Sequence, residues 1–160
     1  KMRRQLHINP NTYVYVYCGS AKPWQCPVQT ISFFKNQLQR KPQALLLVLT
    51  PDTSFFKKIC TQFSIPDTAV HIINSPHNKI YDYLSCADTA LLFRESHIIN
   101  WVSRPTKLLE YWAVGLPVIH NNTVAYAIEH DAYPHGQYAM PQSPALLSDC
   151  MQQQNQQIKD

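Results

Sequence analysis

The sequence predicts an α/β domain in which one parallel sheet is covered by helices on both faces. Short apolar segments rich in β-branched and aromatic residues alternate with segments of helical spacing, about four times over, before a fifth strand. The helical segments are long enough to be crossovers between parallel strands. With 160 residues, 45% of them hydrophobic and 15% charged, the chain has the size and composition of one globular domain with a substantial core.

The expected elements alternate along the chain. Segment 12–18 has alternating Tyr and Val typical of a strand, whereas segment 26–40 has Ile31, Phe34 and Leu38 at helical spacing. Segment 44–49 is apolar throughout, as expected for a strand buried on both faces. Further strands are predicted at 69–74, 89–93 and 117–121, and further helices at 53–64, 78–87, 105–114, 123–130 and 143–160, the last with a fraying glutamine-rich end. This order predicts a doubly wound, Rossmann-like sheet in a single domain, 1–160.

Composition argues against several classes of function. The net charge of +4 is spread along the chain rather than clustered, so no nucleic-acid partner is expected. Five cysteines without a C-x-x-C pair indicate buried thiols in a reducing, cytoplasmic setting. The seven histidines are dispersed along the chain, so we expect no metal site. The longest apolar run, 44–49, is too short to cross a bilayer. Because the chain begins at Lys1 without Met, we expect a piece excised from a longer protein.

Ligands of such sheets bind outside the carboxyl ends of the strands, and Gly19 directly follows the first strand. Only three glycines occur in the chain, where average usage of about 7% would give about eleven. Gly19 therefore indicates either a tight turn or a close approach of phosphate to the backbone. The loop has neither G-x-G-x-x-G nor a P-loop motif, and it lacks the acidic pair of a phospho-receiver domain.

The loop after the fourth strand is the richest in polar side chains. Arg94 and Glu95 leave the strand end together, and a helix follows with Pro105 expected at its first position. Arg104 or Ser103 would then be the N-cap, and Arg104 is a poor one. If Arg104 is the N-cap, the N–H groups of the first turn lack a good side-chain partner, and an anion would serve instead, favoured by the helix dipole and by Lys107.

The same helix places Thr106, Lys107 and Glu110 on one face, because they lie three and four residues apart. Leu108, Leu109 and Trp112 are expected to cover the core side. Anion donors followed by an acceptor one turn deeper match a nucleoside diphosphate, which has phosphates and then ribose hydroxyls. The alternative is a surface helix with a Lys107–Glu110 ion pair.

Three stretches resemble the C-terminal, donor-binding domain of GT-B glycosyltransferases, especially the retaining, bacterial group 1 enzymes that build polysaccharides and lipid-linked glycans. They are "RPTKLLEYWAVGLPVI", "YVYCGSAKPWQ" and "YLSCADTALLF", and the resemblance runs from "RRQLHI" to "VIHNN". It implies a hexosyltransferase whose chemistry needs the full-length protein, with this piece alone inactive.

The resemblance also implies roles for individual residues. Glu110 would accept hydrogen bonds from ribose, and Thr106 and Lys107 would meet the diphosphate, with Lys107 and Glu95 as the catalytic pair. A second family glutamate is replaced by Val102, and Glu95 is its candidate counterpart. The family's basic pair in the first loop is also missing, with only Lys22 near Trp24. The remaining donor-binding residues would be Gly19 and Ser20 beside the phosphates or sugar, Asn74 and Ser75 near the base, and Arg94.

The resemblance implies a nucleotide-sugar donor, UDP- or GDP-linked, used without a metal. The acceptor, a glycan or a lipid-linked glycan, would bind through an N-terminal domain that the chain lacks. The full-length protein would be cytoplasmic, with peripheral association at the inner membrane face. Two alternatives remain open: a sugar-nucleotide epimerase of the same architecture and a non-catalytic nucleotide-binding module.

Overall fold

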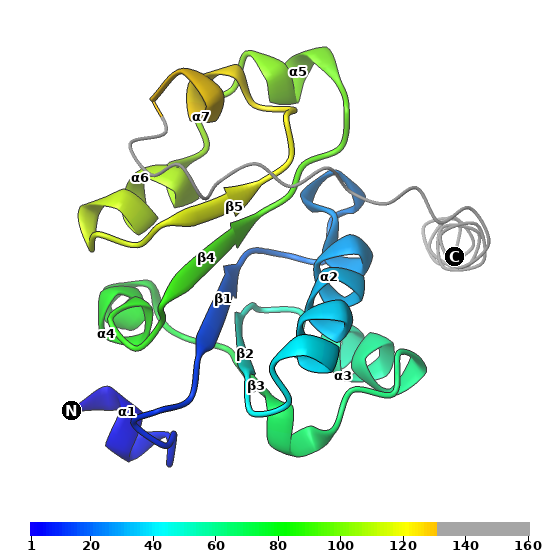
Figure 1. Ribbon diagram of the computed structural model, residues 1–160. Coiled ribbons are helices and arrows are strands. Elements are labelled where there is room, and N and C mark those ends of the chain that lie inside the picture. Colours follow the sequence, from blue (N-terminus) through cyan, green and yellow to red (C-terminus); the bar gives the residue numbers. More distant parts are fainter. Residues whose placement is uncertain (131–160) are drawn as a thin grey trace.

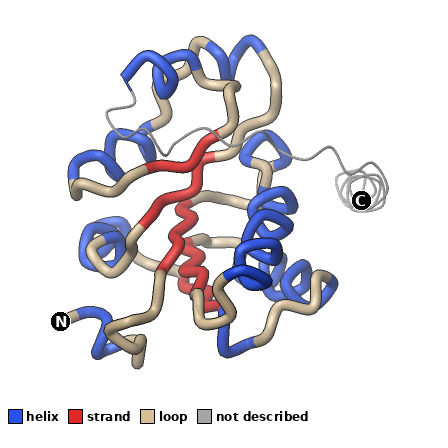
Figure 2. The backbone as a smooth tube through the Cα atoms, in the orientation of Figure 1, coloured by secondary structure: helices blue, strands red, loops and turns tan. Residues whose placement is uncertain are grey.

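The computed structural model describes residues 1–130, which form a five-stranded parallel sheet with helices on both faces (Figures 1 and 2). The strand order is β3-β2-β1-β4-β5, so the chain first moves outward from β1 in one direction and then returns to add β4 and β5 on the other side. This confirms the predicted doubly wound, Rossmann-like fold. The strands are β1 (Val14–Cys18), β2 (Leu45–Leu49), β3 (Val70–Ile73), β4 (Thr89–Leu92) and β5 (Val118–His120).

The helices divide between the two faces of the sheet. In Figure 1, α2 and α3 lie on one side of the strands and α4 and α6 on the other, while α5 and α7 lie above the edge strand β5. No helix in the described range is long and apolar enough to cross a membrane. The helices are α1 (Met2–Gln5), α2 (Pro27–Arg40), α3 (Thr53–Gln62), α4 (Ile80–Leu84), α5 (Ile98–Trp101), α6 (Thr106–Ala113) and α7 (Ala125–His130).

Alternation along β1 divides the interior into two cores. Tyr15 and Tyr17 pack with Phe34 of α2 and Phe56 of α3. Val14, Val16 and Cys18 point to the opposite face, where they belong to a cluster with Leu84 of α4 and Leu108 and Tyr111 of α6. Because the strand is buried on both faces, it shows the continuous apolar sequence expected of a central parallel strand.

The predicted elements are present with shifted ends. The segment expected as a helix over 78–87 begins as a 3₁₀ turn, and its α-helical part, α4, is short. Two short helices, α1 and α5, were not predicted. The prediction that Leu109 faces the core is wrong, because this side chain is 46% exposed on the outer face of α6. The helix predicted at 143–160 lies outside the described residues.

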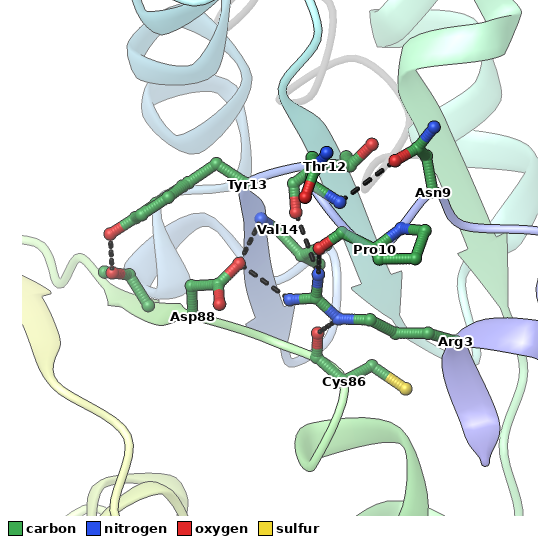
Figure 3. A network of polar contacts seen from close by, with 10 residues as sticks. Arg3, Asn9, Pro10, Thr12, Tyr13, Val14, Cys86 and Asp88 are labelled. Carbon is green, nitrogen blue, oxygen red and sulfur yellow. Dashed lines mark hydrogen bonds and ion pairs between the residues drawn. The ribbon is translucent and has the colours of Figure 1, made fainter.

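A polar network fastens the N-terminal segment to the amino end of the sheet (Figure 3). The Arg3 guanidinium donates to the carbonyls of Cys86, Pro10 and Thr12 and forms a 2.8 Å ion pair with Asp88. The same Asp88 carboxylate accepts the backbone N–H of Val14 at 2.8 Å. Arg3 and Asp88 thereby join the N-terminal segment to the starts of β1 and β4.

Candidate functional site

The carboxyl edge of the sheet holds a cavity of about 390 Å³. It lies where the loops after β1, β2, β3 and β4 meet the start of α6, at the point where the strand order reverses between β1 and β4. Six of the residues predicted to bind the donor line it: Gly19, Ser20, Asn74, Ser75, Arg94 and Lys107. The other lining residues are Cys18, Gln25, Leu49, Thr50, Pro51 and Ile80.

Helix α6 begins without a side-chain cap. Its N-cap is Pro105, in an extended conformation with φ −61° and ψ 122°, so the prediction that Pro105 occupies the first helical position is wrong by one residue. Ser103 instead donates its hydroxyl to the carbonyl of Asn100 at 2.8 Å, within the turn that ends α5. Within residues 1–130, the N–H groups of Thr106 and Lys107 have no hydrogen-bond acceptor. The expected uncapped helix start is present.

Lys107 and Glu110 form an ion pair one turn inside this helix start. The Lys107 Nζ atom lies 2.8 Å from Glu110 Oε2, and the two side chains are 25% and 6% exposed. Burial acts to lower the pKa of Lys107, but the hydrogen bond to Glu110 and the nearby Cys18 and Glu110 groups outweigh it and leave the pKa raised. The pair was foreseen as an alternative on a surface helix, but here it is largely buried, with Lys107 at the cavity and Glu110 behind it.

Tyr111, which sequence reasoning did not assign to the site, fixes α6 against the sheet. Its hydroxyl accepts the backbone N–H of Cys18 at 2.9 Å and lies 3.5 Å from the Leu91 carbonyl, so one side chain joins α6 to the ends of β1 and β4. Burial raises the pKa of Tyr111, which stays a neutral phenol. The only sequence signal was an aromatic residue after Glu110 on the core side of the helix.

The loop after β1 uses its own N–H groups within the protein. Gly19 donates to the Leu49 carbonyl at 3.1 Å, and Ser20 donates to Gln25 Oε1 at 2.9 Å. A Cβ atom on Gly19 would collide with Gln25 Oε1 and lie 2.8 Å from the Tyr17 hydroxyl. Glycine is therefore required for the close packing of this turn. Of the two explanations offered for Gly19 from the sequence, the tight turn accounts for it. The role of Gln25 was not predicted, because no sequence motif around it indicates this hydrogen bond.

The lysine of the first loop does not reach the cavity. Lys22 lies with its ammonium 5.9 Å from the centre of the Trp24 ring, and neither residue lines the cavity. On the β3 side, the Ser75 hydroxyl donates to the Pro76 carbonyl at 3.1 Å. Within residues 1–130, the exposed Asn74 amide has no hydrogen-bond partner and is free to meet a ligand.

Arg94 brings a buried positive charge to the cavity wall. It is only 8% exposed, and its backbone is held by Asn121, whose amide accepts the Arg94 N–H at 2.9 Å and donates to the Arg94 carbonyl at 2.7 Å. Its side chain donates to the carbonyl of Phe93 at 3.0 Å. Within the described range no carboxylate lies in ion-pair distance.

Glu95 is not brought together with Lys107. Its backbone N–H donates to the Trp24 carbonyl at 3.1 Å, and its exposed side chain lines a second cavity of about 210 Å³, which Arg94 also lines. Arg94 thus separates the cavity of Lys107 from that of Glu95, and the catalytic role of Glu95 stays a prediction. Among residues 1–130 no three His, Cys, Asp or Glu side chains lie close enough to hold a metal ion.

No family model matches the sequence, and no curated protein matches it. Solved structures do match. WaaG, a glycosyltransferase involved in lipopolysaccharide biosynthesis, aligns with 94% of this chain at a TM-score of 0.68 and 20% identity, over 40% of its own length. HepE of Anabaena, solved with UDP-glucose, aligns with 99% of this chain at a TM-score of 0.67 and 14% identity, over 43% of its length.

One of the matching structures is a single domain that was solved on its own, and this chain aligns with most of it. It is the C-terminal domain of LpcC, a group 1 glycosyl transferase of Francisella tularensis, which aligns with 98% of this chain at a TM-score of 0.60 and 16% identity, over 80% of that domain. The chain therefore has the fold of the C-terminal half of such enzymes and spans less than half the length of WaaG or HepE.

Proposed function

We propose that this domain is the donor-binding half of a two-domain GT-B glycosyltransferase and that it binds a nucleoside diphosphate sugar in the cavity lined by Lys107. The fold supports the proposal, since the chain matches the separately solved C-terminal domain of a group 1 glycosyl transferase over 80% of that domain. WaaG and the parent enzyme of that domain are glycosyltransferases, and HepE was solved with the nucleotide sugar UDP-glucose. These likenesses favour a transferase over the epimerase and the non-catalytic module.

The observation that carries the proposal is the uncapped start of α6 with Lys107 at the cavity wall. Free N–H groups at a helix start carry partial positive charge, and Lys107 adds a full one. A diphosphate placed there gains charge as its bond to the sugar breaks, and fixed positive groups stabilise that charge without reorganisation. Lys107 is the proposed catalytic residue for this reason.

The rest of the cavity suits the other parts of such a ligand. We assign Glu110, which lies behind Lys107 rather than in the cavity wall, to the ribose hydroxyls, which would compete with Lys107 for the Glu110 carboxylate. Asn74 and Ser75, after β3, are assigned to the base, and Gly19 and Ser20 to the floor beside the phosphates or sugar. A UDP- or GDP-linked sugar is the proposed donor. The acceptor, a glycan or lipid-linked glycan, would bind through a second domain at the cytoplasmic membrane face.

A calorimetric titration of the 160-residue chain with UDP, GDP, dTDP, CMP and ADP tests the proposal. One or more nucleoside diphosphates should bind weakly, at a single site, and more tightly than the corresponding nucleoside. The chain should also transfer no sugar, because only one wall of the expected cleft is present. Failure of every nucleotide to bind would overturn donor binding, and measurable transferase turnover by this chain would overturn the half-enzyme proposal.

A further inference from the structure

The second cavity, on the other side of Arg94, is too small for a nucleotide. Its volume is about 210 Å³, whereas pockets for drug-sized ligands span about 300–1,000 Å³. It lies between the start of α2 and the ends of β4 and β5, and its walls include Val28, Gln29, Arg94, Glu95 and Ser96. A single small chemical group fits this space.

The start of α2 offers this cavity two unused backbone donors. The helix runs for 14 residues, its N-cap is Cys26, and no side chain caps it. Pro27 has no N–H, and the Thr30 N–H is the first to find a carbonyl, that of Cys26 at 3.0 Å. Within residues 1–130, the N–H groups of Val28 and Gln29 have no acceptor. Both residues line the cavity, so the positive end of the helix dipole faces it.

Arg94 is the independent second feature that indicates an anion. Its side chain makes one hydrogen bond, to the Phe93 carbonyl, out of five N–H groups that a guanidinium carries. Within residues 1–130, Nε and Nη2 form no hydrogen bond with protein groups, and the residue, only 8% exposed, lines both cavities. A buried charge of this kind normally has a counter-ion.

Neighbouring groups do not supply that counter-ion. Burial raises the pKa of the Cys26 thiol to about 12, with Arg94 opposing and Glu95 adding to the rise. Burial also raises the pKa of Tyr17 and Tyr111, so all three groups stay neutral at physiological pH. Among the residues that line the cavity, Glu95 is the acid. Its side chain is exposed to solvent, so water and salt screen its charge and it does not act as a fixed counter-ion for Arg94.

We propose that the cavity between Arg94 and the start of α2 is a second anion-binding site, separate from the nucleotide cavity, which takes one phosphate or carboxylate group. The binding site itself stands independently of the transferase proposal. Its use rests on the proposed function: α6 serves the diphosphate of the donor, so the group bound at α2 belongs to the acceptor or to the transferred sugar.

Amide NMR titrations of the full chain with inorganic phosphate, glucose 6-phosphate, glucuronate and neutral glucose test this site. The Val28 and Gln29 amide signals should shift saturably with the anions and not with glucose. A lower dissociation constant for free phosphate than for glucose 6-phosphate would identify the free ion as the ligand, and the reverse would identify a sugar-borne group. Unmoved Val28 and Gln29 signals, or an equal response to glucose, would overturn the site.

The variant Gln29→Glu separates this site from the nucleotide cavity. It places a carboxylate at the free N–H groups and should weaken anion binding at least tenfold while UDP affinity stays unchanged. Gln39→Glu, at the exposed far end of the same helix, adds the same charge and should change neither affinity. Arg94→Gln should also weaken anion binding, with partial rescue by Arg94→Lys. Equal anion affinity in Gln29→Glu and Gln39→Glu would contradict the site.

The two proposals fail in different ways. If UDP leaves the Thr106 and Lys107 signals unmoved while phosphate still shifts Val28 and Gln29, the nucleotide assignment fails and the second site stands. If phosphate shifts only Thr106 and Lys107, the second site is overturned and the nucleotide cavity stands.

Discussion

The Lys107 ammonium lies 2.8 Å from the Glu110 carboxylate. The side chain proposed to bind phosphate and the side chain proposed to bind ribose therefore form an ion pair with each other in the free domain. A nucleotide must therefore divide this pair, drawing Lys107 toward phosphate and leaving Glu110 to the ribose. The pair also keeps both charges compensated before the ligand arrives, which lowers the cost of holding a buried carboxylate beside the sheet.

Glu110→Gln tests both halves of this relationship. It should weaken binding of uridine and UDP by about 1–3 kcal/mol, the cost of a spoiled charged hydrogen bond. It should also lower the free energy of unfolding by about 1–3 kcal/mol, because Lys107 loses its partner while remaining partly solvated. Affinity and urea unfolding are measured on the same preparations, with the exposed Glu129→Gln as the control. Lower stability with unchanged affinity would assign Glu110 a purely structural role.

Lys107→Gln should separate phosphate from nucleoside recognition. Removal of the charge should weaken UDP binding about ten- to a hundred-fold, at about 1.4 kcal/mol per decade, and leave uridine binding nearly unchanged. Lys22→Gln is the matched control, because the Lys22 ammonium lies over the Trp24 ring and outside the cavity. Equal losses for UDP and uridine, measured by calorimetry, would put Lys107 away from the phosphates.

Gly19→Ala should destabilise the domain through contact rather than through backbone strain. The new Cβ would meet Gln25 Oε1 and the Tyr17 hydroxyl, and such overpacking costs about 1–3 kcal/mol. Gly115→Ala serves as the comparison, since its φ of +73° is strained for alanine while its surroundings are empty. Adding Gln25→Ala should recover part of the loss at Gly19 and none at Gly115. Equal recovery at both glycines in urea unfolding would contradict this packing account.

Alkaline pH should destabilise the domain through the buried Cys26 thiol. Its folded pKa is about 12 and its ordinary value is 9.0, so the unfolded chain releases this proton first as pH rises. Stability is then unaffected below about pH 9 and falls by up to about 1.4 kcal/mol per pH unit above it. Urea unfolding under reducing conditions at pH 8, 9 and 10 should show a shallower loss for Cys26→Ala than for the wild type. Parallel curves would exclude this contribution.

The sheet was predictable because burial on both faces leaves a local signature. Segments such as Leu45–Leu49 are short and apolar at every position, which is the pattern of a parallel strand buried on both faces. The candidate site was predictable to the same extent, since residues that follow parallel strands meet at one edge. Five predicted residues line one cavity for this reason, and the sixth, Lys107, lies there because α6 begins beside the same edge.

The missed features depend on partners far away in the sequence. Asn121 holds the backbone of Arg94, and Tyr111 reaches Cys18, yet neither residue differs locally from an ordinary surface or core residue. Leu109 was misassigned because apolar character alone does not state which side of α6 meets the sheet. The start of α6 shifted by one residue because Pro105 suits both an N-cap and a first helical position.

An amide NMR titration of the 160-residue chain with UDP, paired with uridine, tests the central claim most directly. The account predicts saturable one-site shifts with UDP at Thr106 and Lys107, accompanied by shifts at Gly19, Ser20, Asn74 and Ser75, which line the cavity. Uridine should bind more weakly and move Asn74 and Ser75 but not Thr106, because Thr106 is assigned to the diphosphate. UDP shifts that never saturate, or that leave the start of α6 unmoved, would contradict the claim that this cavity binds a nucleoside diphosphate.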